Sequence, residues 1–123
     1  MIVLSIPGHL TTLNEHINAN NRNRYIAAKI KKEETETVMY EVMNQMRRGG
    51  FKIEKYPITI HFKWFRMNKK SDPDNISFAK KYILDGMQKA GLIENDGWKQ
   101  IRGFSDSFHI DTEKPRTEIY IMW

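Results

Sequence analysis

Two aspartates flank a proline in the stretch Asp72-Pro73-Asp74-Asn75, ahead of residues with the pattern of an amphipathic helix. Proline holds its own φ at about −65° and so stiffens the turn that presents both carboxylates. Asp and Asn side chains accept hydrogen bonds from the free amides of a first helical turn. The stretch therefore predicts a turn that leads into a helix and displays two acids at its start.

The helix predicted after this turn has two opposed faces. At about 100° per residue, Asp74, Lys81 and Asp85 lie within about 20° of one line along the helix. The apolar residues lie on the opposite side, and they are Ile76, Ala79, Ile83, Met87 and Ala90. Packing the apolar face on a sheet would leave the two acids and the lysine together on the outer face.

A third acid follows the helix, in the stretch Glu94-Asn95-Asp96-Gly97. A loop there can fold back toward the helix and bring Asp96 to Asp72 and Asp74. A packed group of acids would repel a polyanion unless a divalent cation lay between them, and Mg²⁺ binds carboxylates while it keeps positions for water and phosphate. The spacing therefore predicts a Mg²⁺ site at the three aspartates. The alternative is a solvated helix face that is capped by Asp74 and binds no ligand.

Such a site would suit the hydrolysis of a phosphodiester. A bound metal ion can polarise the phosphate and generate hydroxide from water, and Lys81 could neutralise the developing charge or orient the water. The four histidines show no metal-ligand spacing, and His61 is expected as a strand residue on a polar face. The sequence has neither a Gly-rich phosphate loop nor a Ser nucleophile motif.

Positive charge is concentrated just before the acidic motif. The chain has 20 Lys and Arg against 15 Asp and Glu, a net charge of +5. The only acid in the basic stretch 47–70 is Glu54, and no aspartate precedes Asp72. The stretch 18–25 mixes arginine with amide side chains, which bind phosphate oxygens without reading base sequence. Each stretch alone is compatible with an ordinary solvated surface, but together they predict a polyanionic partner, with nucleic acid first.

The composition excludes several classes of protein. Without cysteine the chain has no disulfide framework, thiolate zinc site or cysteine nucleophile. No apolar run approaches the roughly 20 residues that span a bilayer, and the start lacks a basic segment followed by a long apolar one. A chain of 123 residues can bury enough surface for one core. We therefore expect a soluble, single-domain, intracellular protein.

Hydrophobic periodicity predicts the elements that position these residues. Apolar residues alternate most clearly at 58–65, which predicts a strand, and recur every four residues at 29–48, which predicts a helix that two glycines end. The other expected elements are a strand at 2–6, a polar loop to about 25, the helix from 74 to about 90, and a hairpin with arms at 99–110 and 117–122 around a loop at 111–115. The order β-α-β-α-β-β predicts an α+β domain, in which two helices pack on a mixed β-sheet.

The ordered set of these residues resembles the RusA family of small phage and prophage Holliday junction resolvases. The start Asp72-Pro73-Asp74-Asn75, a helix that ends within 84–93, and the later Asn95-Asp96 occur in the family's order at nearly its spacing. The order of strands, polar loop, helices, basic run and closing hairpin extends the resemblance over almost the whole chain. It implies a single RusA-like endonuclease domain over residues 1–123, in the cytoplasm of a bacterial or phage-infected cell.

The resemblance also implies a homodimer that uses Mg²⁺, or Mn²⁺ in its place, to make paired symmetric nicks in a four-way DNA junction. Asp72, Asp74 and Asp96 match the family's catalytic, metal-binding carboxylates. Lys81 is the match to its catalytic lysine, with Lys80 as the second candidate. Lys81 lies a turn further from Asp74 than in the family.

Further residues receive roles from the same resemblance. Asp85 and Asn75 are expected to support the site without binding the metal, and Asn95 stands where the family commonly has another acid. The segment 14–25 is similar in composition to the family's DNA-facing loop, so we expect Asn14, Arg22 and Arg24 to contact DNA, and the basic stretch predicts the same for Lys69 and Lys70. Recognition is expected to depend on branch shape and phosphates, and therefore on salt.

Two other functions fit the same sequence. One is a related nuclease that prefers flaps or replication forks. The other is a non-catalytic, basic DNA-binding module in which the acids are helix caps and surface charge. For Trp98 and Phe104 we expect packing in the core, with insertion between bases at a junction as the alternative.

Overall fold

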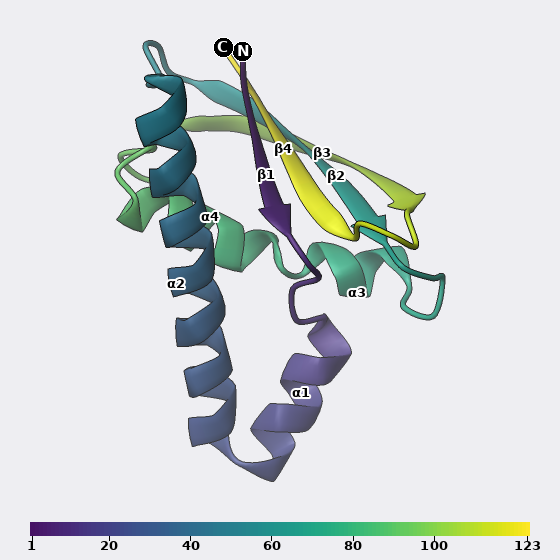
Figure 1. Ribbon diagram of the computed structural model, residues 1–123. Coiled ribbons are helices and arrows are strands. Elements are labelled where there is room, and N and C mark those ends of the chain that lie inside the picture. The colour runs from purple at the N-terminus through teal and green to yellow at the C-terminus, as the bar shows by residue number, and fades with distance from the viewer.

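The computed structural model describes residues 1–123. A four-stranded mixed sheet carries helices on one face, which confirms the predicted α+β class (Figure 1). Four helical segments are present where two helices were expected. The elements in chain order are β1 (Ile2–Pro7), α1 (Leu13–Arg22), α2 (Arg24–Gly49), β2 (Ile58–Arg66), α3 (Pro73–Ser77), α4 (Lys80–Lys89), β3 (Ile101–Ile110) and β4 (Arg116–Met122).

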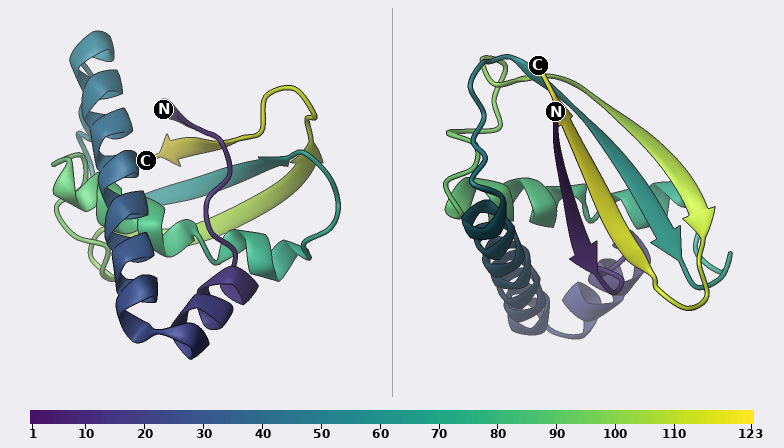
Figure 2. Two further views of the ribbon diagram at one scale, coloured as in Figure 1. Left: turned by 60° about the horizontal axis from the view of Figure 1, so that its bottom comes forward. Right: turned by 45° about the horizontal axis from the view of Figure 1, so that its top comes forward.

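The strand order of the sheet is β1-β4-β2-β3. β4 pairs antiparallel with β1 and β2, and β2 pairs parallel with β3. The predicted hairpin is therefore wrong: both of its strands form, but β2 lies between them (Figure 2). Crossing one strand requires about 10 Å, twice the spacing of neighbouring strands, and the residues 111–115 can span that distance. The amide of Asp111 donates to the carbonyl of Arg66 at 2.8 Å and fixes the crossing at the end of β2.

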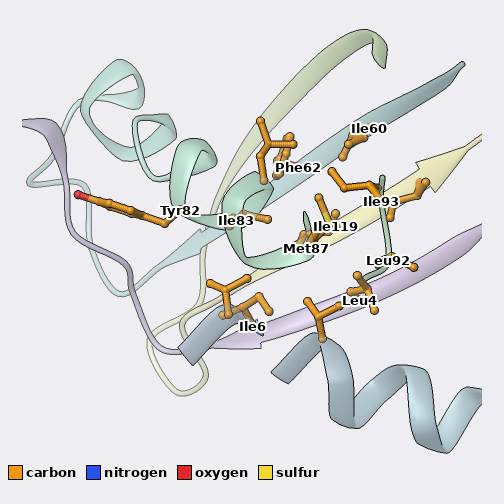
Figure 3. Packing of buried hydrophobic residues seen from close by; sticks show 14 of the residues in the cluster. Leu4, Ile6, Ile60, Phe62, Tyr82, Ile83, Met87, Leu92, Ile93 and Ile119 are labelled. Atoms are coloured by element: carbon orange, nitrogen blue, oxygen red, sulfur yellow. The ribbon is translucent and has the colours of Figure 1, made fainter. Parts of the chain in front are cut away.

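One face of the sheet is buried under the helices and the other is open. The buried face consists of alternate residues of β1, β2 and β4, and they include Leu4, Ile6, Ile60, Phe62, Trp64, Ile119 and Ile121. These side chains pack against Ile83 and Met87 of α4 (Figure 3). On the open face, His61 is hydrogen-bonded to Ser105 and Ser107 at 2.6 and 3.0 Å. The expectation that His61 lies on a polar strand face is confirmed.

Residues expected to continue a polar loop to about 25 instead form α1 and the first turn of α2. α1 begins with a capping box, in which Thr12 Oγ1 accepts from the Glu15 amide at 3.3 Å and the Glu15 carboxylate accepts from the Thr12 amide at 3.2 Å. Asn23 ends α1 in extended conformation, and its side chain caps α2 by accepting from the amide of Tyr25 at 2.8 Å. The polar composition that indicated a loop therefore belongs to helix ends.

The helix predicted from Asp74 to about residue 90 is interrupted between α3 and α4. Main-chain bonds at the interruption span three residues instead of four, and the Tyr82 amide donates to the carbonyl of Ala79 at 3.0 Å. Asp74 and the residues of α4 therefore do not follow one regular helix. Gly91 ends α4 with a φ of 82°, as its position predicts. None of the helices combines the length and the apolar sequence needed to cross a membrane.

Glu34 of α2 holds the segment between β1 and α1 in place. Its carboxylate accepts from the amide of Thr11 at 2.9 Å and from the Thr11 hydroxyl at 2.6 Å. Burial raises the pKa of Glu34 above its ordinary value and outweighs the opposite effect of the bonds from Thr11. The ionised form is therefore less favourable in the folded protein than in the unfolded chain.

As the pH rises, we expect the wild type to lose stability relative to the Glu34→Gln variant. With a raised pKa, the folded state binds the Glu34 proton more tightly than the unfolded state does. This contribution is complete below the unfolded pKa and is lost as the pH passes the folded pKa. Urea unfolding of both proteins between about pH 4 and pH 7 measures the difference. A difference that is independent of pH, or that moves in favour of the wild type, would contradict the expectation.

Candidate active site

The predicted site residues lie along a strip between α3–α4 and the edge strand β3. β3 pairs with β2 alone, so the side chains on its helix-facing side are incompletely covered. Phe104 and Phe108 of β3 are 44% and 39% exposed. Lys80 of α4 reaches Asp106 of β3, and Asp72 lines a hollow together with Phe108. The strip thus combines charged groups with accessible aromatic rings.

Lys81 joins two acids at one end of this strip, where Asp96 and Phe104 line the same hollow. Its Nζ lies 3.2 Å from Oδ1 of Asp85, one turn later on α4, and 3.8 Å from Oδ2 of Asp96, in the loop after α4. The loop returns toward the helix as expected, but it brings Asp96 to Lys81 and not into one group with Asp72 and Asp74. The Lys81 side chain is 56% exposed, so the cluster Asp85–Lys81–Asp96 is open to a large ligand.

The turn after α4 explains why Asp96 returns to the helix. The amide of Leu92 donates to the carbonyl of Met87 at 3.0 Å, which reverses the chain at Gly91. Leu92 and Ile93 are buried in the core and anchor the chain at this point. The remaining residues up to Asp96 are held close to α4 by this anchor.

Lys80 belongs to a separate network, although it is the neighbour of Lys81. Its Nζ lies 2.9 Å from Oδ2 of Asp106, whose other oxygen accepts from the indole nitrogen of Trp64 at 2.8 Å. The same ammonium lies 5.1 and 5.0 Å from the ring centres of Phe62 and Phe104. Of the two candidate lysines, only Lys81 contacts a predicted catalytic acid.

Sequence reasoning did not identify Asp106. One signal was available: Asp106 stands two residues from Phe104 and two from Phe108, so strand alternation places it on the same face as these rings. A charge on the helix-facing side of a strand needs a partner. The partner, Lys80, comes from a distant part of the sequence, and the pairing of β3 with β2 is what brings them together.

Asp72 and Asp74 lie at the other end of the strip. Asp72 occupies the N-cap position of α3, but its side chain makes no capping hydrogen bond. It lines a hollow of about 480 Å³ that also contains Arg66, Lys69 and residues of β3. Asp74 and Asn75, the next motif residues, lie in the first turn of α3, and Asp74 is exposed. The structure therefore places Asp72 and Asp74 apart from the Asp85–Lys81–Asp96 cluster.

The predicted metal-ligand set is not assembled in this structure. No three or more His, Cys, Asp or Glu side chains form a group that could hold a metal ion. The ammonium of Lys81 is paired with the carboxylates of Asp85 and Asp96. It therefore lies where a metal ion bound to Asp96 would be. The carboxylate oxygens are of the kind that Mg²⁺ binds, but Asp72, Asp74 and Asp96 do not form one group in this structure.

The expectation that Trp98 packs in the core is wrong. Its side chain is 97% exposed, so it does not pack in the core, and Phe104 is only half-buried. Trp98 follows Gly97, whose carbonyl accepts from the amides of Gln100 and Ile101 in the turn that leads into β3. The turn directs the indole outward, into a hollow of about 360 Å³ that Asp96 and Phe104 also line.

The residues expected to contact DNA fall into two regions. Asn14 lies in the first turn of α1, while Arg22 and Arg24 lie where α1 meets α2, at the corner farthest from the sheet in Figure 1. Lys69 and Lys70 lie in the loop between β2 and α3, and Lys69 lines the same hollow as Asp72. The second region is thus adjacent to the strip, whereas Arg22 and Arg24 lie at the far end of α1 from Asn14.

Replacement of Lys69 and Lys70 by Gln is expected to weaken binding of a four-way DNA junction and to reduce its salt dependence. If both ammonium groups contact phosphates, the slope of log K against log salt should fall by about 1 to 2. Fluorescence anisotropy of a labelled junction at several salt concentrations measures this slope. Lys52→Gln/Lys55→Gln, with the same loss of charge at exposed positions before β2, is the control. Equal slopes in all three proteins would show that Lys69 and Lys70 make no phosphate contacts.

No model of a known protein family matches the sequence, and a search of curated proteins finds no similar one. The resemblance to the RusA resolvases stays a prediction from the ordered motif. The arrangement of the strip is the structural observation on which a function can be proposed.

Proposed function

We propose that the protein is an endonuclease that hydrolyses phosphodiester bonds in branched DNA, with the four-way junction as substrate. The observation that supports this most strongly is the contact between Asp96 and Lys81, at 3.8 Å. These residues come from different segments, and the resemblance to the RusA family assigns both to catalysis. The fold brings the pair together on an open surface in a chain of net charge +5, which favours polyanionic ligands.

Lys81 and Asp96 are chemically suited to this reaction. The ammonium of Lys81 can stabilise the negative charge that develops on a phosphate under attack, and the carboxylate of Asp96 can accept a proton from the attacking water. Asp85, 3.2 Å from Lys81, restrains the direction of the lysine. Lys80 is less suited, because its ammonium is held by Asp106 and its side chain is only 21% exposed.

The proposal includes Mg²⁺, or Mn²⁺ in its place, with Asp72, Asp74 and Asp96 as ligands. When bound, such an ion supplies a polarised phosphate and an activated water. Because the ligand set is not assembled in the structure, the roles of Lys81 and Asp96 are derived without the ion. We also propose a homodimer, since a two-fold symmetric pair places identical sites on opposed strands of a junction.

A second candidate function is a basic DNA-binding module without catalytic activity. The observation that favours it is the arrangement of the acids: Lys81 already compensates Asp85 and Asp96, and Asp72 and Asp74 lie elsewhere. In this case the aspartates orient lysines and begin α3. Binding of junctions would then depend on the basic residues alone.

Incubation of the wild-type protein with labelled DNA tests these proposals. The substrates are a four-way junction, a flap, a replication fork and a linear duplex, each with Mg²⁺, with Mn²⁺ and with EDTA. Symmetric paired nicks in the junction that require the divalent ion support the proposed activity. Cleavage only of flaps or forks would assign the protein to the related nuclease class. Tight junction binding without cleavage in any condition would favour the DNA-binding module.

A further inference from the structure

A second charged hollow lies between α2 and α4, and Asp85 is its only lining residue to which a role has been assigned. It has a volume of about 610 Å³ and is lined by Lys31, Lys32 and Lys89, together with Gln88, Thr35 and Asp85. None of the three lysine ammonium groups lies within 4.0 Å of a carboxylate. The hollow is therefore a concentration of uncompensated positive charge.

The packing of the two helices creates this hollow. α2 and α4 cross steeply (Figure 1) and approach most closely at Gly86, where a Cβ atom would lie 2.5 Å from Cγ1 of Val38. Thr35 lies about one turn before Val38 on α2, and Gln88 and Lys89 follow Gly86 on α4. The hollow thus occupies the corner that the crossing leaves open.

Thr35, which lines this corner, has a buried hydroxyl without a hydrogen-bond partner. Its side chain is 3% exposed, and its hydroxyl is the one buried side-chain polar atom in the structure without a hydrogen-bond partner. Buried polar groups in folded proteins are nearly always hydrogen-bonded, so an unpaired one indicates a missing ligand, ion or water. Thr35 itself is one of the residues that line the hollow, next to Lys31 and Lys32 on α2.

We propose that the hollow binds a phosphate group. The three ammonium groups offer only positive charge and hydrogen-bond donors, and the Gln88 amide and the Thr35 hydroxyl can also donate to phosphate oxygens. The single acid in the lining, Asp85, is paired with the ammonium of Lys81 at 3.2 Å, which compensates its charge. Cations would be repelled by the lysines, and a carboxylate ligand would leave most of the donors unused.

The backbone of DNA is the source of this phosphate that the structure favours. Asp85 lines the hollow and also contacts Lys81, so the hollow adjoins the Asp85–Lys81–Asp96 cluster. A strand that crosses α4 would present one phosphate to the lysines while the next part of the strand lies at the cluster. This step rests on the proposed function, whereas binding of phosphate itself does not.

Titration of the ¹⁵N-labelled protein with inorganic phosphate tests the site without any cleavage. The amide signals of Thr35 and Gln88 are expected to shift in a saturable way. Lys31→Gln/Lys32→Gln/Lys89→Gln should abolish the shifts, and Thr35→Val should reduce them several-fold with the remaining spectrum unchanged. The control Lys52→Gln/Lys55→Gln/Lys114→Gln, with the same loss of charge, should keep them. Absence of shifts at Thr35 and Gln88 in the wild type would overturn the proposal, whether or not the protein cleaves DNA.

A labelled four-way junction distinguishes the two sources of phosphate. If the hollow holds a backbone phosphate, the triple variant at residues 31, 32 and 89 should bind the junction at least about tenfold more weakly at moderate salt, with a salt slope lower by about 1. The control variant at residues 52, 55 and 114 should change the affinity by less than about threefold. Junction binding that is equal in the two variants would overturn DNA as the source and leave a site for free phosphate or a nucleotide.

Discussion

Replacement of Asp74 or Asp96 by Asn is expected to reduce cleavage of a four-way junction by about 10² to 10⁴-fold, the range for loss of a group that acts in proton transfer. Asn has nearly the shape of Asp but cannot accept a proton at neutral pH and is a poor ligand for Mg²⁺. Binding of the junction should stay the same or become slightly tighter, because an acid near the phosphates is removed. Cleavage is measured on denaturing gels and binding by anisotropy in EDTA.

The matched control is Glu113→Gln, which removes one carboxylate from the exposed loop between β3 and β4. It should cleave at the wild-type rate. The two aspartate variants also separate the parts of the proposed site, because Asp96 contacts Lys81 and Asp74 does not. A loss confined to Asp96→Asn would place the chemistry at the Asp85–Lys81–Asp96 cluster and exclude Asp74. Wild-type cleavage by both variants would contradict the proposed catalytic acids.

Gly86→Ala is expected to lower the free energy of unfolding by about 1–3 kcal/mol, the usual cost of an overpacked core. The added Cβ would lie 2.5 Å from Cγ1 and 2.7 Å from Cβ of Val38, and 3.1 Å from the backbone nitrogen of Met39. Moving α2 and α4 apart would relieve these contacts, but it would also reduce the packing of the helices on the sheet. In an unconstrained helix the same substitution would stabilise by about 0.5–1 kcal/mol, so the sign of the effect is itself diagnostic. Urea unfolding followed by circular dichroism measures it.

Two further variants show whether the contact with Val38 is the cause. Gly103→Ala places a Cβ where no atom lies within 4 Å, so it should be close to neutral. Val38→Ala should be destabilising alone, but Gly86→Ala/Val38→Ala should cost less than the sum of the two single changes by about 0.5–3 kcal/mol. A stabilising effect of Gly86→Ala would show that α2 and α4 are not in close contact in solution.

The sequence by itself determined those features that depend on neighbouring residues. Alternation between Ile58 and Trp64 specified a strand with one buried face, because successive side chains of a strand point to opposite sides. Gly50 and Gly91 specified helix ends, because both adopt the positive φ that other residues avoid. The start of a helix after Asp72 and the proximity of Asp96 to the helix were likewise correct.

Other features were decided only by the tertiary structure. The alternation of apolar residues predicts a strand but does not say which strand it pairs with. β2 therefore lies between β3 and β4, where a hairpin was expected. The point at which the loop after α4 returns to the helix decides that Asp96 meets Lys81, seven residues after Asp74, and that the three acids do not form one group. The pair Lys80–Asp106 depends on which strand lies at the edge. The spacing of apolar residues indicates which side of a helix or strand faces the core. Contacts between distant segments are determined by the packing of the whole chain.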